Sequence, residues 1–253
     1  MEIYLDCESQ ENAIDSLCCL FNCSSIDLTI LLRKIDLKTV DKDVFNSPNY
    51  TPDKYVYRKA VVVFGVPKNP TYINWFHLTR TYHDNKFYQG ILPLGKALQF
   101  LWESLFRIFA GTGHHLRLRE LKDSGKVNSQ YQLKTQSPSL GGPSAVLVKD
   151  IAFRAKEIGN HDYLRLPEIV EDICDGYRDK YGISIHEDVV SSLKPCIVKF
   201  RSNFRIDQSC IEAAIFYVYK RTKGEPLSGD ANTCFDAKGN IIPHGDILSI
   251  KYL

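Results

Sequence analysis

Four polar side chains in one short segment, His77, Thr79, Arg80 and Thr81, have the types and spacing to bind a nucleotide. They lie at the end of the apolar run YINWFHL, residues 72–78. Side chains alternate along a strand, so His77 and Thr79 would project from the same face. An imidazole beside a hydroxyl can hydrogen-bond a ribose or an amide, and Arg80 can hold a phosphate with two parallel hydrogen bonds. The segment therefore predicts a site for a ligand that carries both sugar and phosphate.

The chain after this segment should return to the same site. We expect Gly90 to permit a turn that a side chain would hinder, which brings Ile91 back to the cleft. Alternation also predicts that Phe76 and Leu78 point to the opposite, buried face of the strand. The polar pair would then face a cleft and not the core.

The motif His77-Leu78-Thr79, followed about a dozen residues later by Gly90-Ile91, resembles the start of the NAD site in ADP-ribosyltransferases. The similar proteins are those of the DarT and PARP type and the related RNA 2′-phosphotransferases. In that superfamily the His and Thr contact the nicotinamide-side ribose and amide of NAD. The resemblance implies these roles for His77 and Thr79, in an NAD site that also holds Arg80, Thr81 and Gly90. It further implies a split, mostly antiparallel sheet with flanking helices.

The family also places a glutamate on a later strand, where it activates the acceptor or stabilises the ribosyl cation. Two candidates for this catalytic role are Glu212, which precedes the apolar run 213–219, and Glu168, which follows Pro167. A glutamate in the first turn of a helix also complements the helix dipole, so Glu168 has a structural alternative. A clear late-glutamate motif is missing from the sequence, which leaves open a catalytically altered site.

The resemblance favours an enzyme that takes NAD as its substrate. It would transfer ADP-ribose to a macromolecule, nucleic acid or protein, or hydrolyse NAD, as a toxin or an antiviral defence effector. One alternative is a non-catalytic binding subunit of a defence or toxin–antitoxin assembly, in which the 14 Tyr and 13 Phe serve a protein interface. The other is an RNA-binding or RNA-processing protein, in which the basic segment 114–126 meets nucleic acid with Trp102 or Tyr131 for stacking.

Composition narrows the class of protein. Hydrophobic residues make up 44% and charged residues 25% of the 253, which is typical of a globular protein with a real core. A net charge of +2 is small for a protein that relies mainly on neutralising phosphates. No run of about 18 apolar residues predicts a membrane span, and the N-terminus is acidic where a signal peptide is basic. We therefore expect a cytoplasmic protein whose eight cysteines, Cys18, Cys19 and Cys23 among them, are reduced and metal-free.

Strands and helices do not alternate regularly, so we expect an α+β fold and not a doubly wound sheet. Residues 1–50 should form an N-terminal helical appendage to an NAD-binding α+β domain over 51–253. The appendage would hold a helix at 9–22 and a second one capped by Ser24 or Ser25. The apolar stripe of that second helix is expected to consist of Ile26, Ile30, Leu31 and Ile35.

The other expected elements follow from periodicity and turn residues. Strands are expected at 59–67, central and covered on both faces, at 196–200 and at 247–253, with a hairpin over 233–242. Helices are expected at 95–109, 144–158, 168–181 and 185–193, and a basic loop at 114–126. The run 211–219 fits either a helix or a strand.

Overall fold

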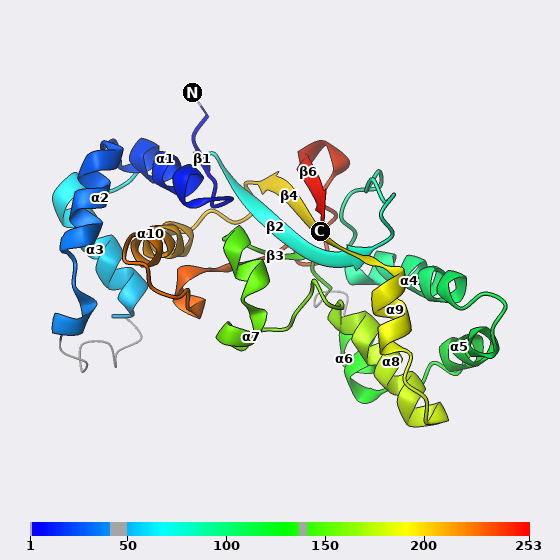
Figure 1. Cartoon of the computed structure of the whole chain (residues 1–253). Helices are drawn as coiled ribbons and strands as arrows, with labels where there is room; N and C mark the ends of the chain where they lie inside the picture. Colours follow the sequence, from blue (N-terminus) through cyan, green and yellow to red (C-terminus); the bar gives the residue numbers. More distant parts are fainter. Residues whose placement is uncertain (1, 41–49, 137–140) are drawn as a thin grey trace. The chain divides into compact units, whose positions relative to one another are not determined.

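The computed structural model describes residues 2–40, 50–136 and 141–253, and it has the expected α+β fold (Figure 1). The sheet has the strand order β5-β3-β2-β4-β6, with β1 also paired to β2, and it is mostly antiparallel. β1 runs parallel to β2, with Tyr4 opposite Tyr72, and β3 runs antiparallel to β2, with Val146 opposite Phe76. The strands are β1 (Tyr4–Leu5), β2 (Tyr72–Thr81), β3 (Ser144–Val146), β4 (Lys194–Ser202), β5 (Cys234–Asp236) and β6 (Ile247–Tyr252).

Helices form where they were expected at 9–22, after Ser24, at 95–109, at 168–181 and at 185–193. The run 211–219, which fitted two states, is helical. The described helices are α1 (Gln10–Phe21), α2 (Ser25–Lys34), α3 (Pro52–Phe64), α4 (Leu94–Ile108), α5 (Gly113–Asp123), α6 (Ser129–Gln136), α7 (Ala155–Ile158), α8 (Glu168–Tyr181), α9 (His186–Ser192) and α10 (Gln208–Thr222).

The chain forms two compact units. The first consists of Met1–Phe76, Ala145–Asn160 and Phe200–Phe235, and the second of His77–Ser144, His161–Lys199 and Asp236–Leu253. The residues expected to form a separate appendage, 1–50, belong to the first unit, which continues along the chain past residue 50 to Phe76. His77, the first residue of the predicted site, is also the first residue of the second unit.

The expected strand over 59–67 is wrong, because the segment 52–64 is the helix α3. Pro52 occupies the first helical turn and Asp53 follows it, a combination that starts helices well. Val56 and Ala60 are buried at a helical spacing, whereas the side chain of Val62 is 83% exposed. The helix start and the amphipathic spacing therefore outweigh the β-branched composition of this run.

The second helix begins as expected but buries a different face. The Ser24 hydroxyl accepts a hydrogen bond from the Asp27 amide at 3.1 Å and so caps α2. Leu28 and Leu32 are fully buried, whereas Ile26 and Ile30 are exposed. The predicted stripe is therefore wrong at Ile26 and Ile30 and right at Ile35, because the spacing of Leu28, Leu32 and Ile35 also fits one helical face.

The expected long helix over 144–158 is wrong. This segment contains β3, a 3-10 turn at Lys149–Phe153 and the short helix α7. The Asn232 side-chain oxygen accepts hydrogen bonds from the Leu147 and Val148 amides, at 3.0 and 3.1 Å. Those amides are thus bonded to a residue more than 80 positions away, which local periodicity does not reveal.

Two other expectations also need correction. The basic segment 114–126 is not a loop, because Leu118 and Leu121 are fully buried on one side of the helix α5. The hairpin over 233–242 does not form either, since β5 pairs with β3 and Ile242 bridges to Ile91.

In the second unit, helices α4, α5, α6, α8 and α9 contribute to one hydrophobic core. Trp102 of α4 is 1% exposed, and its indole donates a hydrogen bond to the Tyr131 hydroxyl at 3.1 Å. Tyr177 of α8 and Val189 of α9 are fully buried in the same core. One side of α4 is therefore fixed by the core, which holds the helix in place for the site described below.

Among the described residues, no single helix is long and apolar enough to cross a membrane. By length and composition alone, the segments Gln10–Phe21 and Ser25–Thr39 together would be long and apolar enough, but they are bent by 101° at the break between them.

Candidate functional site

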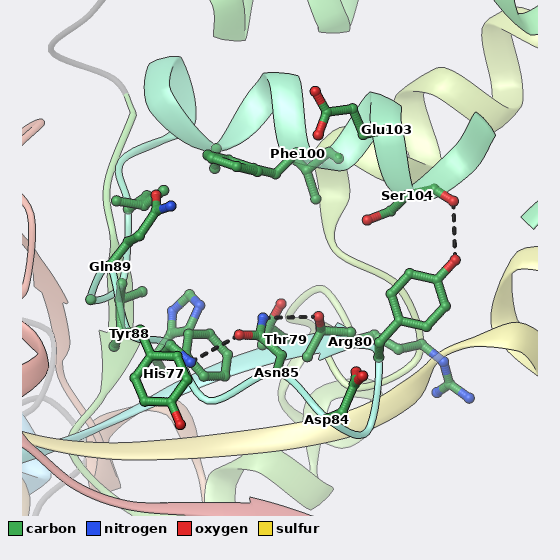
Figure 2. Close-up of a pocket in the computed structure, with 18 of the residues that line it drawn as sticks. His77, Thr79, Arg80, Asp84, Asn85, Tyr88, Gln89, Phe100, Glu103 and Ser104 are labelled. Atoms are coloured by element: carbon green, nitrogen blue, oxygen red, sulfur yellow. Dashed lines mark hydrogen bonds between the residues drawn. The ribbon is translucent and has the colours of Figure 1, made fainter. Parts of the chain in front are cut away.

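The predicted site segment lines a pocket of about 570 Å³ within the second unit (Figure 2). The strand β2, the loop that follows it and the helix α4 form its walls. The lining residues are His77, Thr79, Arg80 and Thr81 of β2, Tyr82, Asp84, Asn85, Phe87, Tyr88, Gln89, Gly90, Ile91 and Leu92 of the loop, and Ala97, Phe100, Leu101, Glu103, Ser104 and Arg107 of α4.

His77, Thr79 and Thr81 line the pocket and Leu78 does not, as strand alternation predicts, although Arg80 also lines it. Phe76 is buried as expected, while Leu78 is half-buried. The structure therefore brings together the imidazole and the hydroxyl that the sequence analysis paired.

The tautomer of His77 follows from one contact. Its Nδ1 lies 2.8 Å from the Ser144 carbonyl oxygen, and because a carbonyl only accepts, Nδ1 carries the proton. Burial lowers the pKa of His77, against the smaller opposing effect of the Ser144 carbonyl. The ring is then neutral at pH 7, with Nε2 as an acceptor. Nε2 has no hydrogen-bond partner among the described residues, so a ligand hydroxyl or amide can donate to it.

The loop after β2 is held by Asn85. Its side-chain amide donates to the Thr81 hydroxyl at 3.1 Å, and its side-chain oxygen accepts from the Phe87 amide at 2.9 Å. The Tyr252 hydroxyl donates to the Asn85 carbonyl at 2.6 Å. Thr81 therefore serves the loop through its hydroxyl, in addition to lining the pocket.

Gly90 and Ile91 return the chain to the pocket as expected, and both line it. Gly90 has φ +79°, a conformation that L side chains rarely adopt. Ile91 and Ile242 exchange two backbone hydrogen bonds, of 2.9 and 3.0 Å. Glycine is thus required at position 90 by the closeness of the chain around Ile242.

Arg80 has a different role from the expected phosphate clamp. Its Nε and Nη2 donate to the Val190 carbonyl at 2.9 and 2.6 Å, and its Nη1 donates to the Leu164 carbonyl at 2.8 Å. Burial lowers its pKa. In Figure 2 the Arg80 side chain leaves the pocket. Because three of its five N–H donors bond backbone carbonyls, the structure does not support Arg80 as the phosphate ligand.

Neither glutamate expected to be catalytic is among the residues that line the pocket. Glu212 lies in α10 of the first unit, is 4% exposed and accepts from the Gln208 amide at 2.6 Å. Glu168 begins α8, accepts from the Tyr163 hydroxyl at 2.9 Å and lies 3.2 Å from the Lys134 ammonium. Burial alone would raise the pKa of Glu168, but these two partners lower it. Glu168 therefore fits the first-turn alternative.

The pocket also has a wall that the sequence analysis missed. Phe100, Glu103, Ser104 and Arg107 line it from α4, opposite β2. A signal for these residues exists, since positions 100, 103, 104 and 107 share one helical face. The apolar periodicity of α4 points only to the core, where Trp102 and Leu105 are buried.

Trp102 and Tyr131 are not available to stack on RNA bases, as the RNA-binding alternative requires, because both are buried and they are hydrogen-bonded to each other. On α5, the Nδ1 of His115 lies 3.0 Å from the Phe106 carbonyl, and its Nε2 accepts from Arg119 at 2.8 Å. These contacts occupy both ring nitrogens of His115 within the unit.

The cysteines give no site in the described part of the chain. All eight are free thiols, and burial raises the pKa of Cys18 to about 12. No group of three or more His, Cys, Asp or Glu among the described residues could hold a metal ion.

The pocket has to be interpreted from its own residues and geometry. No protein-family model, no curated protein and no solved structure matches this chain.

Proposed function

We propose that the second unit binds NAD in this pocket and uses it as a substrate, as an ADP-ribosyltransferase or an NAD glycohydrolase. The observation that carries the proposal is the placement of His77 and Thr79 side by side on β2, facing a pocket to which Gly90 and Ile91 return. This is the arrangement that the His-x-Thr and Gly-Ile resemblance requires.

The chemistry of the walls fits a nucleotide. The neutral Nε2 of His77 accepts from a ribose hydroxyl or an amide, and the Thr79 hydroxyl both donates and accepts. Phe100 and Leu101 supply an apolar surface for a ring. The volume of about 570 Å³ lies within the range usual for ligand pockets.

In the proposed reaction the bond between C1′ of the ribose and the nicotinamide nitrogen breaks, and neutral nicotinamide leaves with the electron pair. Positive charge develops on the ribose, where a carboxylate stabilises it. An acceptor hydroxyl, amine or water then bonds to C1′ and releases a proton. Asp84 and Glu103 are the carboxylates that line the pocket in the described part of the chain.

The test is release of nicotinamide from NAD by the purified chain, with His77→Ala as the variant and His83→Ala as the matched control. His83 lies in the loop after β2, is exposed and is not among the lining residues. We expect the His77 variant to lose release and the His83 variant to keep it, with melting temperatures of both close to that of the parent. Absence of both NAD binding and nicotinamide release in the parent chain would overturn the proposal.

A second candidate function is non-catalytic nucleotide binding, as in a subunit of a larger assembly. It is favoured by one observation, that neither Glu212 nor Glu168 lines the pocket. Calorimetric binding of NAD without nicotinamide release would select this function. If release occurs, growth arrest on expression, relieved by His77→Ala, would support a toxin or defence role.

A further inference from the structure

We infer that Arg107, and not Arg80, binds the phosphate of the nucleotide, at the end of the pocket where Ser104 lies. The inference rests on the proposed function, because it assigns a residue of the same pocket to one part of the ligand. Two arginines are among the lining residues, Arg80 and Arg107. The Arg80 guanidinium is bonded to the Val190 and Leu164 carbonyls, which leaves Arg107 for an anionic ligand.

Arg107 is held in a way that leaves its N–H donors open. It lies in the last turn of α4, and its guanidinium carbon is 4.5 Å from the centre of the Tyr82 ring. Stacking on an aromatic face fixes the guanidinium plane without using its hydrogen-bond donors. Arg107 has no ion pair or hydrogen bond from its side chain to any residue that the structure describes. It can therefore offer two parallel N–H groups to a phosphate.

The position of Arg107 fits the orientation that the ribose site imposes. Figure 2 shows His77, Tyr88 and Gln89 at one end of the pocket and Ser104 at the other. The Tyr82 hydroxyl donates to the Ser104 carbonyl at 3.2 Å, which places Tyr82, and Arg107 stacked on it, at the Ser104 end. A ribose bound at His77 and Thr79 would thus direct its phosphates along α4 towards Arg107.

The other charges near this end of the pocket disfavour a phosphate, so its binding depends on Arg107. Asp84 and Glu103 also line the pocket, and Glu103 is bonded to the Gln99 amide at 2.9 Å. The C-terminal end of α4 carries the negative end of the helix dipole. Asp84, Glu103 and the dipole all disfavour an anion, so affinity for phosphate at this end depends on the Arg107 cation.

The experiment compares ADP-ribose, which carries a diphosphate and an adenosine, with nicotinamide riboside, which carries neither, by calorimetry. The variants are Arg107→Gln and Arg107→Lys, with Arg119→Gln as the matched control. Arg119 is exposed on α5, stacks on Phe106 at 5.0 Å and is not among the lining residues.

We expect Arg107→Gln to weaken ADP-ribose binding by roughly 10- to 100-fold, the loss of a charge-assisted pair, and to leave nicotinamide riboside within about two-fold. Arg107→Lys should also weaken ADP-ribose, because an ammonium does not reproduce the two-pronged contact, and it serves if the Gln variant does not fold. The Arg119 variant should bind both ligands as the parent does. Equal weakening of both ligands, or unchanged ADP-ribose affinity in the Arg107 variants, would overturn the assignment while leaving the nucleotide site standing. A parent chain that binds neither ligand overturns both the assignment and the proposed function.

Discussion

Gly90 approaches Ile242 so closely that a Cβ atom on Gly90 would lie 2.1 Å from the Ile242 carbonyl oxygen. The same pair of chain segments is joined by two backbone hydrogen bonds between Ile91 and Ile242. One wall of the pocket therefore depends on a contact between segments about 150 residues apart in the sequence.

Gly90→Ala should destabilise the protein and disturb the pocket. The new methyl group meets a backbone oxygen, and φ +79° is strained for alanine, so we expect a loss of about 1–3 kcal/mol or more in the free energy of unfolding. Denaturant unfolding measures the loss, and NAD titration measures the damage to the pocket. Gly95→Ala is the control, because its Cβ would meet nothing within 4 Å and alanine favours the helix α4. Equal stability of the two variants would contradict this account.

Arg80→Lys should lower stability without changing the phosphate dependence of binding. The lysine cannot keep the bonds to both Val190 and Leu164, so we expect a loss of about 1–3 kcal/mol in the free energy of unfolding. Arg165→Lys, on an exposed ion pair with Glu187, should cost less than about 0.5 kcal/mol. A large loss of ADP-ribose affinity in folded Arg80→Lys, with stability unchanged, would restore Arg80 as the phosphate clamp.

The contacts of Arg80 and the conformation of the segment 52–64 show what local sequence does and does not predict. β2 and α4 were predictable because their apolar residues follow strand and helix periods. The partners of Arg80 lie 84 and 110 residues away, and no local pattern encodes them. The run KAVVVFGVP has the composition of a strand, but its conformation is set by the helix start at Pro52, outside the run. To predict the pocket wall from α4, both the local periodicity and the long-range packing would be needed. The helix itself was predictable from its periodicity, but its distance to β2 was not.

The pH dependence of stability should contain a contribution from His77. Burial lowers its pKa in the folded protein, so between the folded pKa and the ordinary value of 6.5 the unfolded chain binds more protons. Its contribution to stability is therefore fully present above pH 6.5 and declines as the pH falls below that value. We expect the free energy of unfolding of the parent to fall more steeply from pH 7 to pH 5 than that of His77→Asn. Denaturant melts across this range measure the difference, and parallel curves for the two proteins would show that His77 does not resist protonation.

The identity of the catalytic carboxylate can be tested with four variants, if nicotinamide release is observed. Glu168→Gln removes an acceptor of Lys134 and Tyr163, and Glu212→Gln alters a buried contact with Gln208, but neither residue lines the pocket. We expect both of these variants, once folded, to release nicotinamide at the rate of the parent. Asp84→Asn and Glu103→Gln neutralise the carboxylates that line the pocket in the described part of the chain. The one that stabilises the ribosyl cation should lose about 10²-fold or more in kcat, with a smaller change in KM, because the charge it opposes develops only in the transition state. Loss of kcat in Glu168→Gln or Glu212→Gln, with Asp84→Asn and Glu103→Gln active, would contradict the pocket as described. It would mean that the carboxylate reaches the ribose from a residue outside the described lining.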